Sequence, residues 1–259
     1  MLVAGKKFLV TGVLTEASIA FATARLIQEQ GGEVILTSFG RAIRLTERCA
    51  ARLPEKPDVL ELDITQPRHL AELARDISDR WGVLDGALHA IAYAPEPCLD
   101  DSLLTASWAD VSTALQVSAF SLKSLAGAVA PLMHRGGSIV ALDFDASQAW
   151  PGYNWMGVAK AALESLARYL ATELGPHNIR VNLVSAGPLS TVAARAIPQF
   201  AAYEHIWKAR APLGWDLTDA QAVGRACVAL LSDWFPATTG EIVHVDGGAH
   251  AVGAVATER

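Results

Sequence analysis

The sequence predicts an α/β fold of the doubly wound, Rossmann-like class, with a parallel sheet of about seven strands and helices on both faces. Short β-branched apolar runs alternate with longer segments of helical periodicity along the chain. Parallel strands need such crossover connections, and these are nearly always right-handed. The 259 residues are enough to build one large core without a second domain.

The predicted elements alternate regularly along the chain. The expected strands are Phe8–Val10, Val34–Thr37, Val59–Leu62, Ala87–Ala92, Ser138–Leu142, Arg180–Val184 and Ile242–Val245. The expected helices are Ile19–Gln30, Ile43–Leu53, Pro67–Trp81, Trp108–Met133, Asn154–Leu174 and Ala220–Leu231. Ligands of such sheets bind beyond the carboxyl ends of the strands, so functional residues are expected in those turns. We therefore expect residues 1–259 to form a single dinucleotide-binding domain.

Composition is typical of a globular, cytoplasmic protein. Apolar residues make up 51% of the chain and charged residues 19%, which excludes a disordered protein. The net charge of −6 argues against a nucleic-acid partner. No uninterrupted apolar run is long enough to predict a membrane span, and Met1–Lys7 lacks the features of a signal peptide. Cys49, Cys98 and Cys227 lie far apart, so we expect reduced thiols and no metal site.

The first strand ends at a candidate phosphate site with an incomplete glycine motif. Of the fingerprint G-x-G-x-x-G only Gly12 is present, and the next helix begins near Ser18 and Ile19. Free amides at a helix N-terminus can hold a pyrophosphate, with Ser18 as a hydroxyl donor. The alternative is that Ser18 is only an N-cap and Gly12 only a strand-end glycine. The position of this turn favours dinucleotide binding.

The ends of the second and third strands carry candidate adenosine contacts. An acid at the second strand end usually binds the ribose 2′-hydroxyl, but this chain has Phe39 followed by Arg41. Phe39 could lie beside the adenosine, and Arg41 leaves NADPH open as a cofactor, unless it is simply solvated. Asp63 could accept from the adenine amino group, or could only initiate the turn before Pro67.

The strongest candidates for chemistry are a tyrosine and a lysine after the fifth strand. Tyr153 follows a Pro-Gly turn at a predicted helix start, and Lys160 comes seven residues later. Seven residues are close to two helical turns, so both side chains can share one helix face. The lysine could hold a nicotinamide ribose while its charge eases proton movement at the phenol. Alternatively, Tyr153 is an amphipathic helix-start residue and Lys160 a surface lysine.

With this order of elements and this tyrosine–lysine spacing, the chain resembles the enoyl-acyl-carrier-protein reductases, a divergent branch of the short-chain dehydrogenases. It resembles their actinobacterial members especially. The resemblance covers nearly the whole chain and rests on an ordered set of short motifs. These are Gly12 with Ser18–Ala20, Leu60–Asp63, His89–Ala92, Asp143–Asp145, Tyr153–Lys160, Ala186–Pro188, Leu231–Trp234 with Ala237–Gly240, and Asp246–Gly248. Ordinary members of the superfamily place lysine four residues after tyrosine, where this chain has Gly157, and a catalytic serine where it has Val140 and Ala141.

The resemblance implies reduction of the C2=C3 bond of trans-2-enoyl thioesters by NADH, with Tyr153, Lys160 and Phe144 as catalytic residues. Other members carry a second tyrosine at Phe144, so a phenyl ring there is interpreted as a gate near C3. The implied cofactor contacts are Gly12, Ser18, Ile19, Phe39, Asp63, Ile64, Ile91, Ala92, Lys160, Gly187, Leu189 and Thr191. The implied substrate contacts are Tyr93, Ala94, Met156 and Ile197. A carbonyl-reducing dehydrogenase and a non-catalytic nucleotide sensor remain alternatives.

The segment near 191–212 is expected to form the substrate-binding lid. It is apolar and aromatic, with Ile197, Phe200, Tyr203, Ile206 and Trp207. It looks shorter than in the long-chain members of the family, which favours short to medium acyl chains. The resemblance also implies an acyl carrier protein, or coenzyme A, as the bearer of the substrate. It further implies a homotetramer, with Ala249–Ala256 as a candidate interface stretch, and no membrane partner.

Overall fold

The computed structural model describes residues 1–99, 102–192, 194–198 and 200–253. Its seven strands form one all-parallel sheet in the order β3-β2-β1-β4-β5-β6-β7. The strands are β1 (Lys7–Val10), β2 (Glu33–Ser38), β3 (Val59–Glu61), β4 (Gly86–His89), β5 (Gly137–Asp143), β6 (Ile179–Ala186) and β7 (Ile242–Val245). The order reverses between β1 and β4, and such a switch point opens a crevice for ligands at the carboxyl edge. The fold class predicted from the sequence is confirmed.

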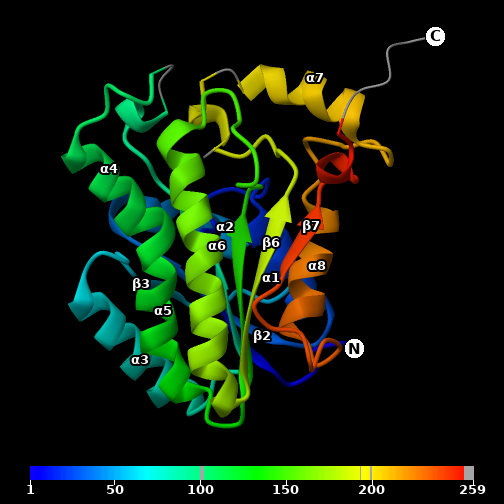
Figure 1. The fold of residues 1–259 in the computed structure, drawn as a ribbon. Coiled ribbons are helices and arrows are strands. Elements are labelled where there is room, and N and C mark those ends of the chain that lie inside the picture. The colour runs from blue at the N-terminus through cyan, green and yellow to red at the C-terminus, as the bar shows by residue number, and fades with distance from the viewer. Residues whose placement is uncertain (100–101, 193, 199, 254–259) are drawn as a thin grey trace.

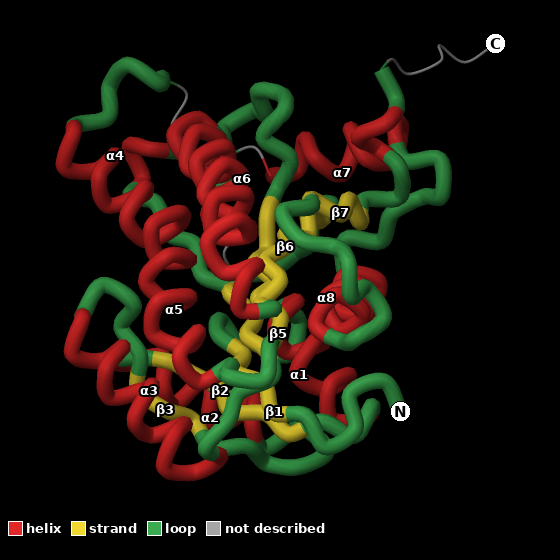
Figure 2. Tube along the Cα trace, turned by 60° about the horizontal axis from the view of Figure 1, so that its bottom comes forward, coloured by secondary structure: helices red, strands yellow, loops and turns green. Residues whose placement is uncertain are grey.

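Helices cover both faces of the sheet (Figure 1). They are α1 (Ile19–Glu29), α2 (Ile43–Ala50), α3 (Pro67–Trp81), α4 (Trp108–Leu115), α5 (Ser121–Val129), α6 (Asn154–Leu174), α7 (Phe200–Arg210) and α8 (Gln221–Leu231). One hydrophobic core lies between the sheet and α1, α2 and α8, and a second between the sheet and α3, α5 and α6. The tube view in Figure 2 shows these helices wrapped around the strands.

The predicted helix over Trp108–Met133 is interrupted in the structure. It consists of α4, a π-helix over Gln116–Phe120, α5 and a short 3₁₀ turn at Ala130–Leu132. The whole run Trp108–Leu132 is long and apolar enough to cross a membrane by length and composition, and 39% of its most apolar window is buried. A core helix of a soluble protein passes the same test, so the run is weak evidence for a span. Its buried side chains, such as Leu122 and Leu125, belong to the second core.

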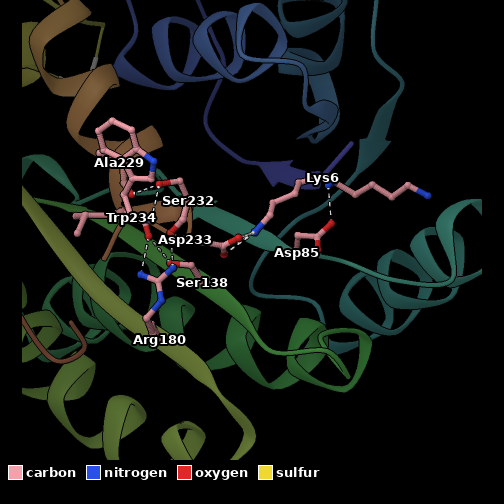
Figure 3. Close-up of polar contacts among 10 residues, drawn as sticks. Lys6, Asp85, Ser138, Arg180, Ala229, Ser232, Asp233 and Trp234 are labelled. Carbon is pink, nitrogen blue, oxygen red and sulfur yellow. Dashed lines mark hydrogen bonds and ion pairs between the residues drawn. The ribbon is translucent and has the colours of Figure 1, made fainter. Parts of the chain in front are cut away.

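A polar network ties the end of α8 to the sheet, at the edge opposite the candidate site (Figure 3). The Arg180 guanidinium donates to the carbonyl oxygens of Leu230 and Ser232 at 2.8 and 2.7 Å. The Ser138 hydroxyl donates to the same Leu230 carbonyl at 2.8 Å. These donors satisfy carbonyls that the last turn of a helix leaves unpaired, and they place a positive charge at its negative end. The network fixes α8 against β5 and β6 and leaves the carboxyl edge free.

All three cysteines are free and buried. Burial raises the pKa of the Cys49 and Cys98 thiols and raises that of Cys227 to about 12. Because the thiolate is the reactive form, these thiols are inert at neutral pH. The expectation of reduced, structural cysteines agrees with these environments. No group of residues suited to hold a metal ion occurs in the described part of the chain.

Candidate active site

A cavity lies at the carboxyl edge of the sheet, between the loops after β4, β5 and β6 and the segment that carries α7. Twelve of the residues predicted from the sequence line it together: Ile19, Ala92, Tyr93, Ala94, Phe144, Tyr153, Met156, Lys160, Gly187, Leu189, Thr191 and Ile197. Figure 1 shows α7 lying across this end of the sheet. The fold therefore brings the predicted catalytic and substrate residues, and six of the predicted cofactor residues, into one cavity.

Tyr153 and Lys160 meet the cavity from the first two turns of α6. Tyr153 stands at the N-cap position of α6 and its side chain is buried. Burial raises the pKa of the Tyr153 phenol well above its usual value, and the nearby Asp143 carboxyl raises it further. The Tyr153 hydroxyl therefore stays protonated and is available as a donor to a ligand.

Lys160 is buried, with its side chain ending at the sheet edge. Its Nζ donates to the carbonyl oxygen of Leu142, the next-to-last residue of β5, at 2.8 Å. Burial lowers the pKa of Lys160, while the Asp143 and Glu164 carboxylates oppose that change. An ammonium has three donors, so two remain for other partners after the bond to Leu142. The strand thus aims the amine at the cavity that Lys160 lines.

Asp143, the last residue of β5, is a site residue to which the sequence analysis gave no role. It lines the cavity, yet both of its carboxyl oxygens are buried without a hydrogen-bond partner in the described residues. Burial raises the pKa of Asp143 to about 7; Lys160 lowers it and Glu164 raises it. Its position at the end of the strand before Tyr153 was a signal in the sequence that could have identified it as a site residue. Its burial, however, depends on how α6 packs on β5.

His89, at the end of β4, lies behind the site and is fully buried. Its Nε2 is 2.8 Å from the Ser121 hydroxyl, which donates to the Val117 carbonyl at 2.6 Å. Burial lowers the pKa of His89 to about 3, and the charge of Lys160 lowers it as well. A neutral imidazole therefore anchors the first turn of α5 to the strand end.

The π-helix before α5 holds the loop that follows β4. The Ser118 hydroxyl accepts from the Tyr93 amide at 2.9 Å and donates to the Tyr93 carbonyl at 2.8 Å. This pair of bonds fixes Tyr93, whose side chain is exposed, beside the cavity that it lines. π-helical turns often occur at functional sites. Here the turn points a serine at a loop 25 residues earlier in the chain.

The turn after β1 has the shape expected of a phosphate site. Gly12 has a φ of +80°, and a Cβ there would lie 2.0 Å from the carbonyl oxygen of Ala90. Only glycine fits this close approach of two strand ends. The Ser18 hydroxyl caps α1 by accepting from the Phe21 amide at 3.1 Å. The other first-turn amides of a helix lack partners within it, so they remain available to an anion.

Besides Gly12 and Ser18, four predicted cofactor contacts lie outside the cavity lining, at neighbouring strand ends. Phe39 is 52% exposed after β2, and Ile91 is partly buried after β4. Asp63 Oδ1 accepts from both the amide and the hydroxyl of Thr65, which is the turn-forming role considered as its alternative. The Ile64 side chain is buried in the second core, so only its backbone could face a ligand. Their contacts with a cofactor stay predictions.

Comparison with known proteins decides the family. Residues 12–250 match the family described as enoyl-(acyl carrier protein) reductase. The chain belongs to this family. It is 46% identical over 258 residues to an NADH-dependent enoyl-acyl-carrier-protein reductase of Mycobacterium avium, covering 95% of this chain and 96% of that one. It is 45% identical to the reductase of the same name from Mycolicibacterium smegmatis, covering 96% and 97%. A relative of that name from Aquifex aeolicus is 37% identical, covering 99% and 96%.

Membership of the enoyl-acyl-carrier-protein reductases confirms the resemblance inferred from the motifs. The structure also shows why the carbonyl-reducing alternative is disfavoured. Ala141, where an ordinary short-chain dehydrogenase has its serine region, is fully buried in β5 and carries no hydroxyl. Gly157 stands one turn after Tyr153, where those enzymes have their lysine, and a Cβ there would touch the Tyr153 ring at 3.6 Å. The non-catalytic alternative is disfavoured by the relatives' names, all of which are enzyme names.

Proposed function

We propose that this protein reduces the C2=C3 double bond of trans-2-enoyl thioesters with NADH, in fatty-acid elongation. The observation that carries the proposal is the buried pair of Tyr153 and Lys160 in one cavity, without a serine hydroxyl on β5. The relatives named above are NADH-dependent reductases of this substrate class, which supports both the reaction and NADH as the donor. In the sequence, Arg41 was the one residue that left NADPH possible as the hydride donor.

The residues at the carboxyl edge fit a dinucleotide. The cradle at Gly12, which a Cβ would fill, and the N-terminus of α1 at Ser18 suit the pyrophosphate. The backbone of Gly187–Leu189 would lie near the carboxamide of the nicotinamide and Thr191 near the pyrophosphate. Ile91 and Ala92 would line the cofactor floor. When bound, NADH supplies the hydride that reaches C3 of the substrate. Phe39 and Asp63 remain proposed contacts of the adenosine end, and Ile64 remains a proposed cofactor contact.

Tyr153 and Lys160 would carry the protein's part of the chemistry. As C3 gains the hydride, negative charge develops on the thioester oxygen, and the Tyr153 hydroxyl donates a hydrogen bond to it. One such oxyanion donor is typically worth about 3–4 kcal/mol. Lys160, aimed by its bond to the Leu142 carbonyl, would hold the ribose hydroxyls and so orient the ring. The positive charge of Lys160 would also ease proton movement at the Tyr153 phenol.

The apolar side of the cavity would take the acyl group. Phe144 packs edge-on against Tyr153, with ring centroids 5.1 Å apart, so it can gate the approach to C3. Tyr93, Ala94, Met156 and Ile197 would contact the substrate. The chain acts as one domain, with the segment near 191–212 as a lid that carries α7. The short lid favours short to medium acyl chains.

The substrate would be borne by an acyl carrier protein or by coenzyme A. Of the basic residues near the lid, Arg195 and Lys208 are exposed, whereas Arg210 donates to the Val252 carbonyl at 2.9 Å. Glu204 is exposed among them, so the carrier is inferred from the family and not from the charge of this surface. Because this family acts in fatty-acid synthesis, we also propose that the protein is soluble and cytoplasmic.

We further propose a homotetramer. The face of α4, α5 and α6 leaves large apolar side chains in water, among them Trp108 (75% exposed) and Tyr169 (74%). Patches of this kind commonly mark subunit interfaces. This face supports the assembly better than Ala249–Ala256, of which residues 254–256 lie outside the described residues. Light scattering at several protein concentrations measures the mass directly.

The reaction is tested by following NADH absorbance with crotonyl-thioester and, separately, with a simple ketone. We expect oxidation with the thioester and none above background with the ketone. Oxidation with the ketone alone would overturn the proposal. Repeating the thioester assay with NADPH tests the choice of donor, because a preference for NADPH would assign Arg41 to a 2′-phosphate.

A further inference from the structure

Four aromatic side chains close one end of the cavity, and we call them the aromatic wall: Phe144, Trp150, Tyr203 and Trp207. Phe144 and Tyr203 belong to the cavity lining, and their ring centroids are 5.7 Å apart. Trp150 and Trp207 stand behind them, each within 5.7 Å of the Phe144 ring and 5.0 Å from one another. All of these distances are typical of packed ring pairs. The wall is therefore two rings deep.

Each polar ring of the aromatic wall is bound to a backbone carbonyl. Trp150 Nε1 donates to Asp145 at 2.7 Å, Tyr203 Oη donates to Pro151 at 2.8 Å, and Trp207 Nε1 donates to Asp246 at 3.1 Å. Two of these carbonyls lie in the loop between β5 and α6, and the third lies after β7. Swinging any of these rings aside would leave a buried donor and acceptor unpaired, which is unfavourable.

The aromatic wall is also sealed from behind. Tyr203 is 1% exposed and Trp207 2%. The Arg210 guanidinium lies over the Trp150 ring, 5.6 Å from its centroid. On the lid side, the carbonyl of Pro198 approaches so closely that a Cβ on Gly152 would lie 2.5 Å from it. The rings are therefore buried and held in place from behind by packed groups of the protein.

From this geometry we infer that the aromatic wall, and Tyr203 in particular, sets an upper limit on acyl length. The inference rests on the proposed function, because it concerns the substrate of the same cavity. With C3 beside Tyr153 and Phe144, the acyl tail extends into the apolar end of the cavity and meets the Tyr203 ring. Acyl chains long enough to reach past this ring must displace Tyr203 and break its bond to Pro151.

The test compares turnover along a series of trans-2-enoyl thioesters with four, eight, twelve and sixteen acyl carbons. For the unmodified protein we expect kcat/KM to fall from the eight-carbon to the sixteen-carbon substrate. In Tyr203→Ala the ratio of the twelve-carbon to the four-carbon kcat/KM should rise by about tenfold or more, since each accommodated methylene contributes about that much to discrimination. Trp234→Ala is the control, because Trp234 is 74% exposed after α8, at the edge of the sheet opposite the cavity, and its loss should leave the ratio unchanged.

Two results would overturn the inference while the proposed function stands. One is a kcat/KM of the unmodified protein that rises steadily to sixteen carbons. The other is an unchanged ratio in Tyr203→Ala that retains four-carbon turnover. If Tyr203→Ala does not fold, as judged by circular dichroism, Tyr203→Leu shortens the side chain with less loss of volume and is read in the same way. Absence of turnover on every thioester by the unmodified protein would instead reject the proposed function.

Discussion

The buried histidine behind the site gives a prediction whose size follows from the structure. His89 Nε2 donates to the Ser121 hydroxyl, and its Nδ1 is buried without a partner among the described residues. Protonation would add a second N–H that has no acceptor, close to the charge of Lys160. These causes lower the pKa of His89 from 6.5 to about 3. In the unfolded chain the same group binds a proton near its ordinary pKa.

The direction in which stability changes with pH follows from the number of protons that each state binds. Between the two pKa values the unfolded state binds the proton and the folded state does not, so stability falls as pH falls below about 6.5. At pH 5 the difference amounts to about 2 kcal/mol, because each pKa unit corresponds to about 1.4 kcal/mol. The contribution is lost progressively toward pH 3, where the folded protein also becomes protonated at this site.

The assay is urea unfolding at pH 7 and pH 5, at one protein concentration. His89→Gln keeps an amide donor for Ser121 and does not titrate, so its free energy of unfolding should fall by about 2 kcal/mol less than that of the unmodified protein between the two pH values. His177→Gln is the control, since His177 is exposed after α6 and its loss should preserve the full decrease. Equal decreases in His89→Gln and the unmodified protein would show that His89 is protonated in the folded state and refute the reasoning.

Three further predictions concern the chemistry. Tyr153→Phe should lower kcat by about 10²–10⁴ if the hydroxyl is a proton donor in the reaction, as stopped-flow NADH oxidation would show; a change under threefold would assign oxyanion stabilisation to another group. Phe144→Ala should slow reduction but retain NADH binding, as measured by fluorescence titration. An unchanged rate of reduction would contradict the gating role of Phe144. Asp143→Asn removes a charge that raises the pKa of Lys160, so the alkaline limb of kcat/KM should move to lower pH; an unmoved limb would mean that Asp143 does not act through Lys160.

The sheet and most helices could be predicted because their periodicities are local. α3, α6 and β7 have the predicted bounds, and the other strands differ from prediction by a few residues at their ends. The break between α4 and α5 could not be predicted, since it depends on Ser118 binding a distant loop. Asp63 makes the turn-forming bonds that were one of its two alternatives, and these bonds depend on the position of Thr65.

The candidate site was predictable to the extent that it follows strand ends and a motif. Tyr153 and Lys160 share a cavity as their spacing suggested, and Phe144, which the resemblance implied, lines it as well. The burial of Asp143 and His89 was not predictable, because it depends on how α6 and α5 pack on the sheet. Trp150 was missed for a related reason. Its contacts with the lid form only when α7 folds back over the loop after β5.

The buried cysteines make this protein a ready host for site-specific probes. All three native thiols are shielded and hard to ionise, so a maleimide added under native conditions has no favourable native target. A single cysteine introduced at the exposed Glu204 on α7 would therefore carry a dye or spin label alone. Such a label would report, in real time and without prior removal of native thiols, whether the lid moves as substrate enters and product leaves.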